Sequence, residues 1–277
     1  MLTLVSVTNA RGDTLQLPLL DSSAGYVVED IEGLDPVNAT LTTSSLAQVD
    51  GATPQNAQRG TRNITMTLGF APDFVTNTVD SLKTGLYDYL LSKANVDLGF
   101  YKDGDLFAVT SGQVESFQNT LFAADPMVDI SIICYDPDFY GPSVISSSLN
   151  TVSDTTVNTI SYDGSTEAGV IFTLNVNRSD LTSFTIYNTT PSNVQQKMSI
   201  VNTTGPFSSG DAVTINTIPG SKSVTLLSGG VTSSALPFLD PTSTWISLEK
   251  GDNAFRCFAN GAAIPYTLAY TPKYGAL

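Results

Sequence analysis

Short segments in which apolar and polar residues alternate, divided by Gly, Pro, Asn and Asp turns, restrict this chain to a mainly β fold. Residues 62–70 show the pattern best, because Ile64, Met66 and Leu68 alternate with polar side chains, as in a half-buried strand. Beyond Gly141, short strands are predicted at 170–176, 183–187, 197–202, 212–216, 223–227, 244–248, 253–259 and 266–270. Strands at this spacing indicate a β-sandwich or jelly roll.

The first half adds a helix to its strands. Strands are predicted at 2–7, 15–19, 26–31, 62–70, 96–101, 105–117 and 126–134. Apolar residues recur at helical spacing over 77–93, where Thr76 or Thr78 can cap the N-terminus and Lys93 falls in the last turn. One amphipathic helix covering one sheet makes this half an α+β domain.

The acidic residues are concentrated in the first half of the chain. The formal net charge is −14; residues 1–140 hold 18 carboxylates against 6 cations, whereas residues 141–277 hold 8 against 6. Such different charge densities predict two domains, 1–141 and 142–277. An acidic chain repels phosphate backbones, which disfavours tight binding of nucleic acid; solubility is the ordinary alternative reading of the acid excess.

The composition disfavours catalysis and metal binding. The chain has no His, which removes the commonest general base and metal ligand. Cys134 and Cys257 form no CxxC motif and are predicted to be free and buried. The pairs Asp136 with Asp138 and Glu249 with Asp252 sit in turn sequences, where local hydrogen bonds explain them better than glycosidase chemistry. We therefore expect no enzyme, catalytic residue, metal or cofactor.

Membrane insertion and export by a signal peptide are also disfavoured. No apolar run approaches the ~18 to 20 residues that span a bilayer, and no basic start precedes an apolar stretch.

A long polar segment from 39 to 62 predicts an extended hairpin arm with Asp50 and Gly51 at its middle. Its polar side chains cannot form a core, so pairing with another subunit would satisfy its backbone groups; a disordered surface loop is the alternative. Arg59 and Arg62 are the only cations between Arg11 and Lys83. Together with Asp50 and Gly51 they form the expected oligomer interface, against the alternative of contacts within the domain or with solvent.

The sequence resembles the phage distal tail proteins, the Dit family of tail-tip hubs. The first-half stretches that carry the resemblance are YVVEDIEGLDPVNATL, VDGATPQNAQRGTRNITMTLGF and YDPDFYGP. In the second half, IVNTTGPFSSGDAVTINTIPGSKSVTLLSGG, WISLEKGDNAFRCF and YTPKY are similar to the galectin-like C-terminal β-sandwich of that family. The stretches follow the family's order over nearly the whole chain.

The resemblance implies an N-terminal β-sandwich with one helix and a long hairpin arm, followed by a galectin-like or jelly-roll β-sandwich. It further implies a homohexameric ring at the virion tail tip, synthesised in the host cytoplasm. Its partners would be the tail tube protein and tail-fibre, tail-tip or receptor-binding proteins. DNA would pass through its channel without specific binding. The arm, which wraps onto a neighbouring subunit in the family, corresponds to about 41–62.

Two further hypotheses concern surface residues. An acidic channel wall lets a polyanion slide, so we expect some of six aspartates to face the lumen: Asp73, Asp80, Asp88, Asp97, Asp103 and Asp105. The single tryptophan, Trp245, is a candidate platform for stacking a sugar, although core or interface packing is the commoner role. A carbohydrate-binding module that aids attachment to the host is therefore the alternative function.

Overall fold

The computed structural model describes residues 1–19, 21–45, 50–120 and 125–277. The chain forms two compact units, one of residues 1–142 together with 274–277 and the other of residues 143–273. The sequence places residues 274–277 in the second domain, but they pack with the first unit: Tyr274 stacks on Phe107 with ring centroids 5.1 Å apart.

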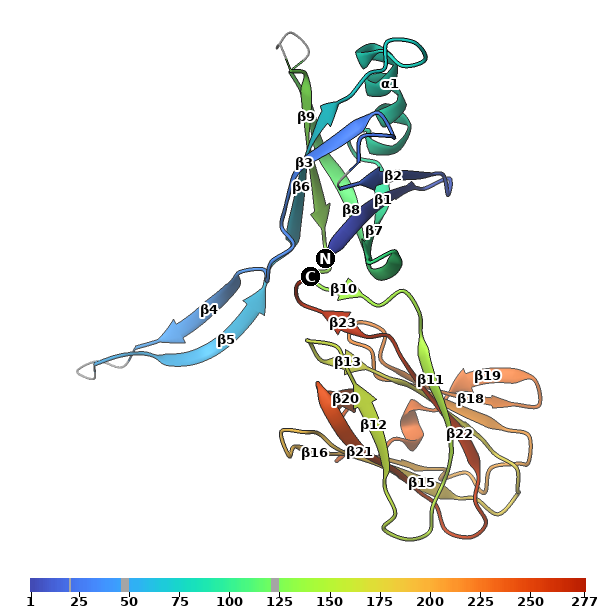
Figure 1. Ribbon diagram of the computed structural model, residues 1–277. Coiled ribbons are helices and arrows are strands. Elements are labelled where there is room, and N and C mark those ends of the chain that lie inside the picture. The colour runs from blue at the N-terminus through green and yellow to red at the C-terminus, as the bar shows by residue number, and fades with distance from the viewer. Residues whose placement is uncertain (20, 46–49, 121–124) are drawn as a thin grey trace. The chain divides into compact units, whose positions relative to one another are not determined.

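An antiparallel sheet in the order β2-β1-β7-β8-β9-β6-β3 forms the centre of the first unit (Figure 1). The short strands β10 and β23 also belong to it. Its strands are β1 (Leu2–Asn9), β2 (Thr14–Pro18), β3 (Tyr26–Glu32), β6 (Arg62–Phe70), β7 (Asn95–Lys102), β8 (Asp105–Asn119), β9 (Met127–Cys134), β10 (Phe139–Tyr140) and β23 (Lys273–Tyr274).

Helix α1 (Val79–Leu90) covers the apolar face of this sheet. Leu82, Leu86 and Leu90 are buried in one core with the inward residues of the strands. Thr78 caps the helix through a reciprocal pair of hydrogen bonds with Ser81, which satisfies free N–H groups of the first turn. The predicted helix is confirmed but shorter; Lys93 lies beyond its end with a positive φ of 72°, so it does not interact with the last turn as expected.

The arm is an antiparallel hairpin of β4 (Ala39–Ser44) and β5 (Thr53–Arg59), and it extends away from the sheet (Figure 1). Every residue of both strands is exposed. The predicted extended hairpin is therefore present among the described residues, and the disordered-loop alternative does not describe them.

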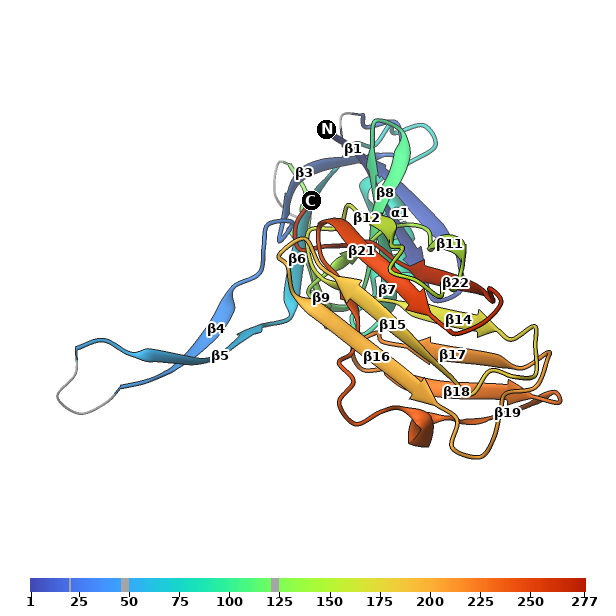
Figure 2. The same ribbon diagram turned by 90° about the horizontal axis from the view of Figure 1, so that it is seen from below.

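The second unit is a β-sandwich. One sheet has the order β11-β22-β14-β17-β18-β19 and the other β12-β21-β15-β16 (Figure 2). The short strands β13 and β20 pair with each other as a separate two-stranded sheet. The strands are β11 (Ile145–Asn150), β12 (Asn158–Tyr162), β13 (Ala168–Gly169), β14 (Ile171–Asn175), β15 (Ser183–Thr189), β16 (Gln195–Val201), β17 (Ala212–Asn216), β18 (Ser223–Ser228), β19 (Val231–Ser234), β20 (Ser247–Leu248), β21 (Gly251–Phe258) and β22 (Pro265–Tyr270). A short 3-10 helix, η1 (Leu236–Phe238), follows β19.

Alternating side chains of the two sheets meet in one core. Phe172 of β14 lies at its centre, with ring centroids 4.9 Å from Tyr266 and 6.0 Å from Phe184. Cys257 is buried there and Cys134 is buried in the first unit, both as free thiols, as predicted. The mainly β fold class is confirmed. Within the described ranges, no helix is long and apolar enough to cross a membrane.

Candidate functional site

The outer face of the first unit's sheet carries carboxylates held by hydroxyl groups. Ser111 donates to Asp97 over 2.6 Å, Ser131 donates to Glu115 over 2.7 Å, and Thr67 donates to Asp129 over 2.8 Å. Thr65 donates to Glu32 over 3.3 Å on the same face, at the edge of the sheet that β3 forms. All four carboxylates are exposed, whereas their strand neighbours, such as Val96, Leu98 and Ile130, point into the core. We call Glu32, Asp97, Glu115 and Asp129 the acidic sheet face.

The six aspartates expected at a lumen are all exposed, but they do not share one surface. Asp97 lies on the acidic sheet face. Asp80 and Asp88 lie on α1, which covers the opposite, apolar face of the sheet. Asp103 and Asp105 flank the β7–β8 turn, at the end of both strands. The six cannot all line one channel wall, because the sheet separates them.

Asp73 has a structural role in the turn that precedes α1. Its carboxylate accepts hydrogen bonds from the backbone N–H groups of Val75, Thr76 and Asn77 at 2.8–3.0 Å and from the Thr76 hydroxyl at 2.5 Å. These bonds stabilise the ionised form and lower the pKa of Asp73 well below its usual value, with the Thr76 hydroxyl contributing most.

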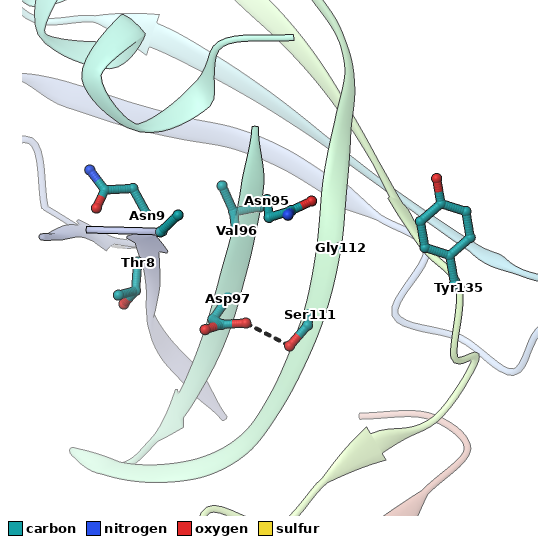
Figure 3. A pocket seen from close by; sticks show the side chains of 9 residues that line it. Thr8, Asn9, Asn95, Val96, Asp97, Ser111, Gly112 and Tyr135 are labelled. Carbon is teal, nitrogen blue, oxygen red and sulfur yellow. Dashed lines mark hydrogen bonds between the residues drawn. The ribbon is translucent and has the colours of Figure 1, made fainter. Parts of the chain in front are cut away.

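A shallow depression of about 320 Å³ adjoins Asp97 on the sheet face (Figure 3). Figure 3 shows Asp97 and Ser111 hydrogen-bonded across β7 and β8, with Asn95 and Tyr135 nearby. No cluster of three or more His, Cys, Asp or Glu that could hold a metal occurs in the described part of the chain. The lining offers hydrogen-bonding groups and no arranged nucleophile with a base.

The arm carries a small apolar strip. By register Leu41 pairs with Ala57 and Ala39 with Arg59, whereas Thr40 pairs with Gln58 on the other side of the ribbon. Leu41 is 69% exposed, although it is the largest apolar side chain of these two strands. Asp50 and Gly51 are exposed just before β5, and Gly51 has a φ of 98° suited to a turn.

Arg59 and Arg62 have different environments. Arg59, at the end of the arm, makes a two-pronged ion pair with Asp138, with N–O distances of 2.5 and 3.0 Å; this hydrogen bonding raises the pKa of Arg59. Arg59 keeps 39% of its side chain exposed. Arg62 is fully buried and bonded to backbone carbonyls of its own unit. The expectation that Arg62 contacts a neighbour is corrected, because a buried guanidinium presents no surface; the alternative of contacts within the domain describes it.

Trp245 is half-buried against the core of the second unit. The Lys222 ammonium lies 5.3 Å from the centre of its ring. A cation already occupies the ring face, so sugar stacking on Trp245 would have to displace it.

Three carboxylates of the two pairs, Asp136, Asp138 and Glu249, make local contacts. Asp138 pairs with Arg59, and Asp136 accepts hydrogen bonds from the Tyr140 hydroxyl and the Asp138 N–H. Glu249 accepts from Ser192.

Sequence reasoning missed Glu32, Glu115 and Asp129 of the acidic sheet face. A signal for Asp129 was present, because it alternates with Val128 and Ile130 in a predicted strand. The alternating pattern could not place Glu115 on this face, because Glu115 lies at a β-bulge between Val114 and Ser116 that breaks the alternation.

Comparisons with known proteins agree with the fold. Residues 163–274 match the family model described as "Siphovirus-type tail component, C-terminal domain". No curated protein matches the chain. The solved Dit protein (gp 19.1) of phage SPP1, described as a paradigm of the hub adsorption apparatus in phages infecting Gram-positive bacteria, is similar with a TM-score of 0.66 and 17% identity, covering 97% of this chain and 98% of that one.

Two baseplate structures are more distant. The phage P2 baseplate in its activated conformation with Ca gives a TM-score of 0.45 at 10% identity, with all of both chains covered. The phage p2 baseplate with Sr gives 0.40 at 11% identity, covering 96% of this chain and 97% of that one. The resemblance to distal tail proteins is confirmed, because the family model matches residues 163–274 and the chain shares the fold of the SPP1 Dit protein.

Proposed function

We propose that this chain is the distal tail hub of a phage virion: a ring of six copies that joins the tail tube to baseplate, tail-fibre or receptor-binding proteins and surrounds a channel for DNA. The observation that carries the proposal is the exposed arm on a unit whose chain shares the fold of a known hub protein. The first unit would form the ring, and the second unit would hold the partner proteins.

The arm is unlike a self-sufficient element. A two-stranded ribbon in water is marginally stable, and this one exposes every residue of both strands. Its Leu41 and Ala57 strip and its free strand edges gain burial and hydrogen bonds only against another surface. A second copy of this chain is the partner that a closed ring supplies.

The acidic sheet face suits the wall of the channel. Four carboxylates spread over β7, β8, β9 and β3 repel a passing polyanion, which therefore does not adhere. Of the six aspartates expected at the lumen, Asp97 is the one that this face includes.

Substitution of Leu41 tests the role of the arm. Leu41→Asp places a charge in the contact that the proposal requires, so we expect the dissociation constant of the ring to rise on the order of tenfold or more, measured by native mass spectrometry over a concentration series. Leu91→Asp is the matched control, since Leu91 is 56% exposed after α1. Rings of equal stability in the two variants would exclude the arm as the subunit contact.

A further inference from the structure

Arg62 draws three distant segments of the first unit together. Its Nε donates to the Pro137 carbonyl oxygen over 2.8 Å. One terminal nitrogen donates to the carbonyl oxygens of Gly33 and of Asp35, the latter over 2.7 Å. The other terminal nitrogen donates to the Gly275 carbonyl oxygen over 2.6 Å. Four of the five guanidinium N–H groups are thereby satisfied.

Each segment leads to another part of the molecule. Residues 33–35 lead from β3 into the arm, whose first strand starts at Ala39. The chain passes from the first unit to the second after Pro142, and Pro137 lies a few residues before this crossing. The chain returns to the first unit at Tyr274, and Gly275 is the next residue. The Leu277 N–H also donates to the Leu34 carbonyl oxygen over 3.1 Å, which ties the returning segment directly to the entry of the arm.

Only an arginine fits this arrangement. The carbonyl oxygens lie around the planar guanidinium group of Arg62, which has several donors. The Phe139 ring packs over this group, with the ring centroid 4.2 Å from the guanidinium carbon. Burial lowers the pKa of Arg62, so the carbonyl dipoles and the ring must offset the cost of removing the cation from water. A lysine ammonium would keep the charge but could not reach all four oxygens.

Two residues next to the Arg62 contacts also fix these segments in position. Gly33 has a φ of 86°, and a Cβ there would collide with the Asn63 carbonyl, so only glycine lets its own carbonyl approach Arg62. Asp138, 2% exposed and next to Pro137, holds Arg59 at the other strand of the arm. Both strands of the arm are therefore fixed to the crossing segment.

We propose that Arg62 is a positioning residue that joins the root of the arm and both chain crossings to the second unit into one cooperative junction. The arm then leaves the sheet in one fixed direction before any neighbour is bound, which reduces the ordering cost of assembly. This consequence rests on the proposed function, whereas the junction itself does not.

Hydrogen exchange of the full chain, followed by mass spectrometry, tests the junction. In Arg62→Lys we expect exchange in segments 31–38 and 272–277 to accelerate together, on the order of tenfold or more, with no change in segment 127–134 of the sheet. Arg11→Lys is the matched control, because Arg11 is an exposed cation paired with Asp13 in a turn of the same unit. Acceleration in one segment alone, or in neither, would overturn the junction.

The wild-type chain provides a second measurement should Arg62→Lys fail to fold. In a series of urea concentrations below global unfolding, the two segments should lose protection at one common concentration, before the sheet does. Loss at different concentrations would overturn the junction. A wild-type chain that shows the common loss but forms no ring supports the junction and contradicts the proposed function.

Discussion

Two arginines three residues apart show how far a side chain's role depends on the fold. In the sequence, Arg59 and Arg62 are equivalent cations in a long acidic stretch. In the structure, Arg59 is a partly exposed member of an ion pair, and Arg62 is a buried donor to carbonyls 27 to 213 positions away in the chain. No local pattern could distinguish them, because the acceptors of Arg62 are backbone oxygens of distant loops.

Asp73 leads to a prediction about pH. Its pKa in the folded protein lies below the unfolded value of ~3.9, so its stabilising effect is present above that value and is lost as the pH falls through the folded pKa. We expect Asp73→Ala to lower the urea midpoint of the first unit by a constant amount between about pH 5 and 8, and by progressively less below about pH 4.

Two optical signals separate the units in this experiment. The helical circular dichroism follows the first unit, since α1 is the one α-helix among the described residues, and Trp245 fluorescence follows the second. The fluorescence midpoint should be unchanged by Asp73→Ala. If the urea midpoints of Asp73→Ala and the wild type, followed by helical circular dichroism, differ as much at acid pH as at neutral pH, the assigned role of Asp73 is contradicted.

At the scale of elements, periodicity predicted the strands that contribute to a core. The strand predicted at 212–216 matches β17 in both limits, and those for β7, β8 and β9 differ by at most two residues. Three of the missed strands, β11, β12 and β19, contain several Ser or Thr residues, and all three lie at sheet edges, where only one face or neither is buried. The strand predicted at 244–248 shrinks to β20, because Trp245 lies before the pairing begins.

The two faces of the first sheet lead to a prediction about DNA passage. We expect particles carrying Asp97→Asn, Glu115→Gln and Asp129→Asn together to release DNA severalfold more slowly, because a neutral wall no longer repels the phosphates. Asp80→Asn, Asp88→Asn and Asp105→Asn make the matched control, with the same loss of charge away from the acidic sheet face. Release that slows equally in both sets, or in neither, would remove the sheet face from the channel wall.

At the scale of the whole molecule, the described features are surfaces on different elements of the chain. The chain combines a sheet with one polar acidic face, an exposed hairpin and a separate β-sandwich, and the described residues form no metal-binding cluster. These surfaces fit the assembly role proposed for the chain. The sequence indicated this through its lack of His and through its resemblance to tail hubs, but it could not place the surfaces, which depend on register and bulges.

Native mass spectrometry of the purified full chain over rising protein concentration tests the central claim most directly. We predict a closed species of six copies of the 29.3 kDa chain, dominant at high concentration and without a ladder of larger open assemblies. A chain that remains a single copy at every concentration, or that grows into open polymers, would contradict the ring.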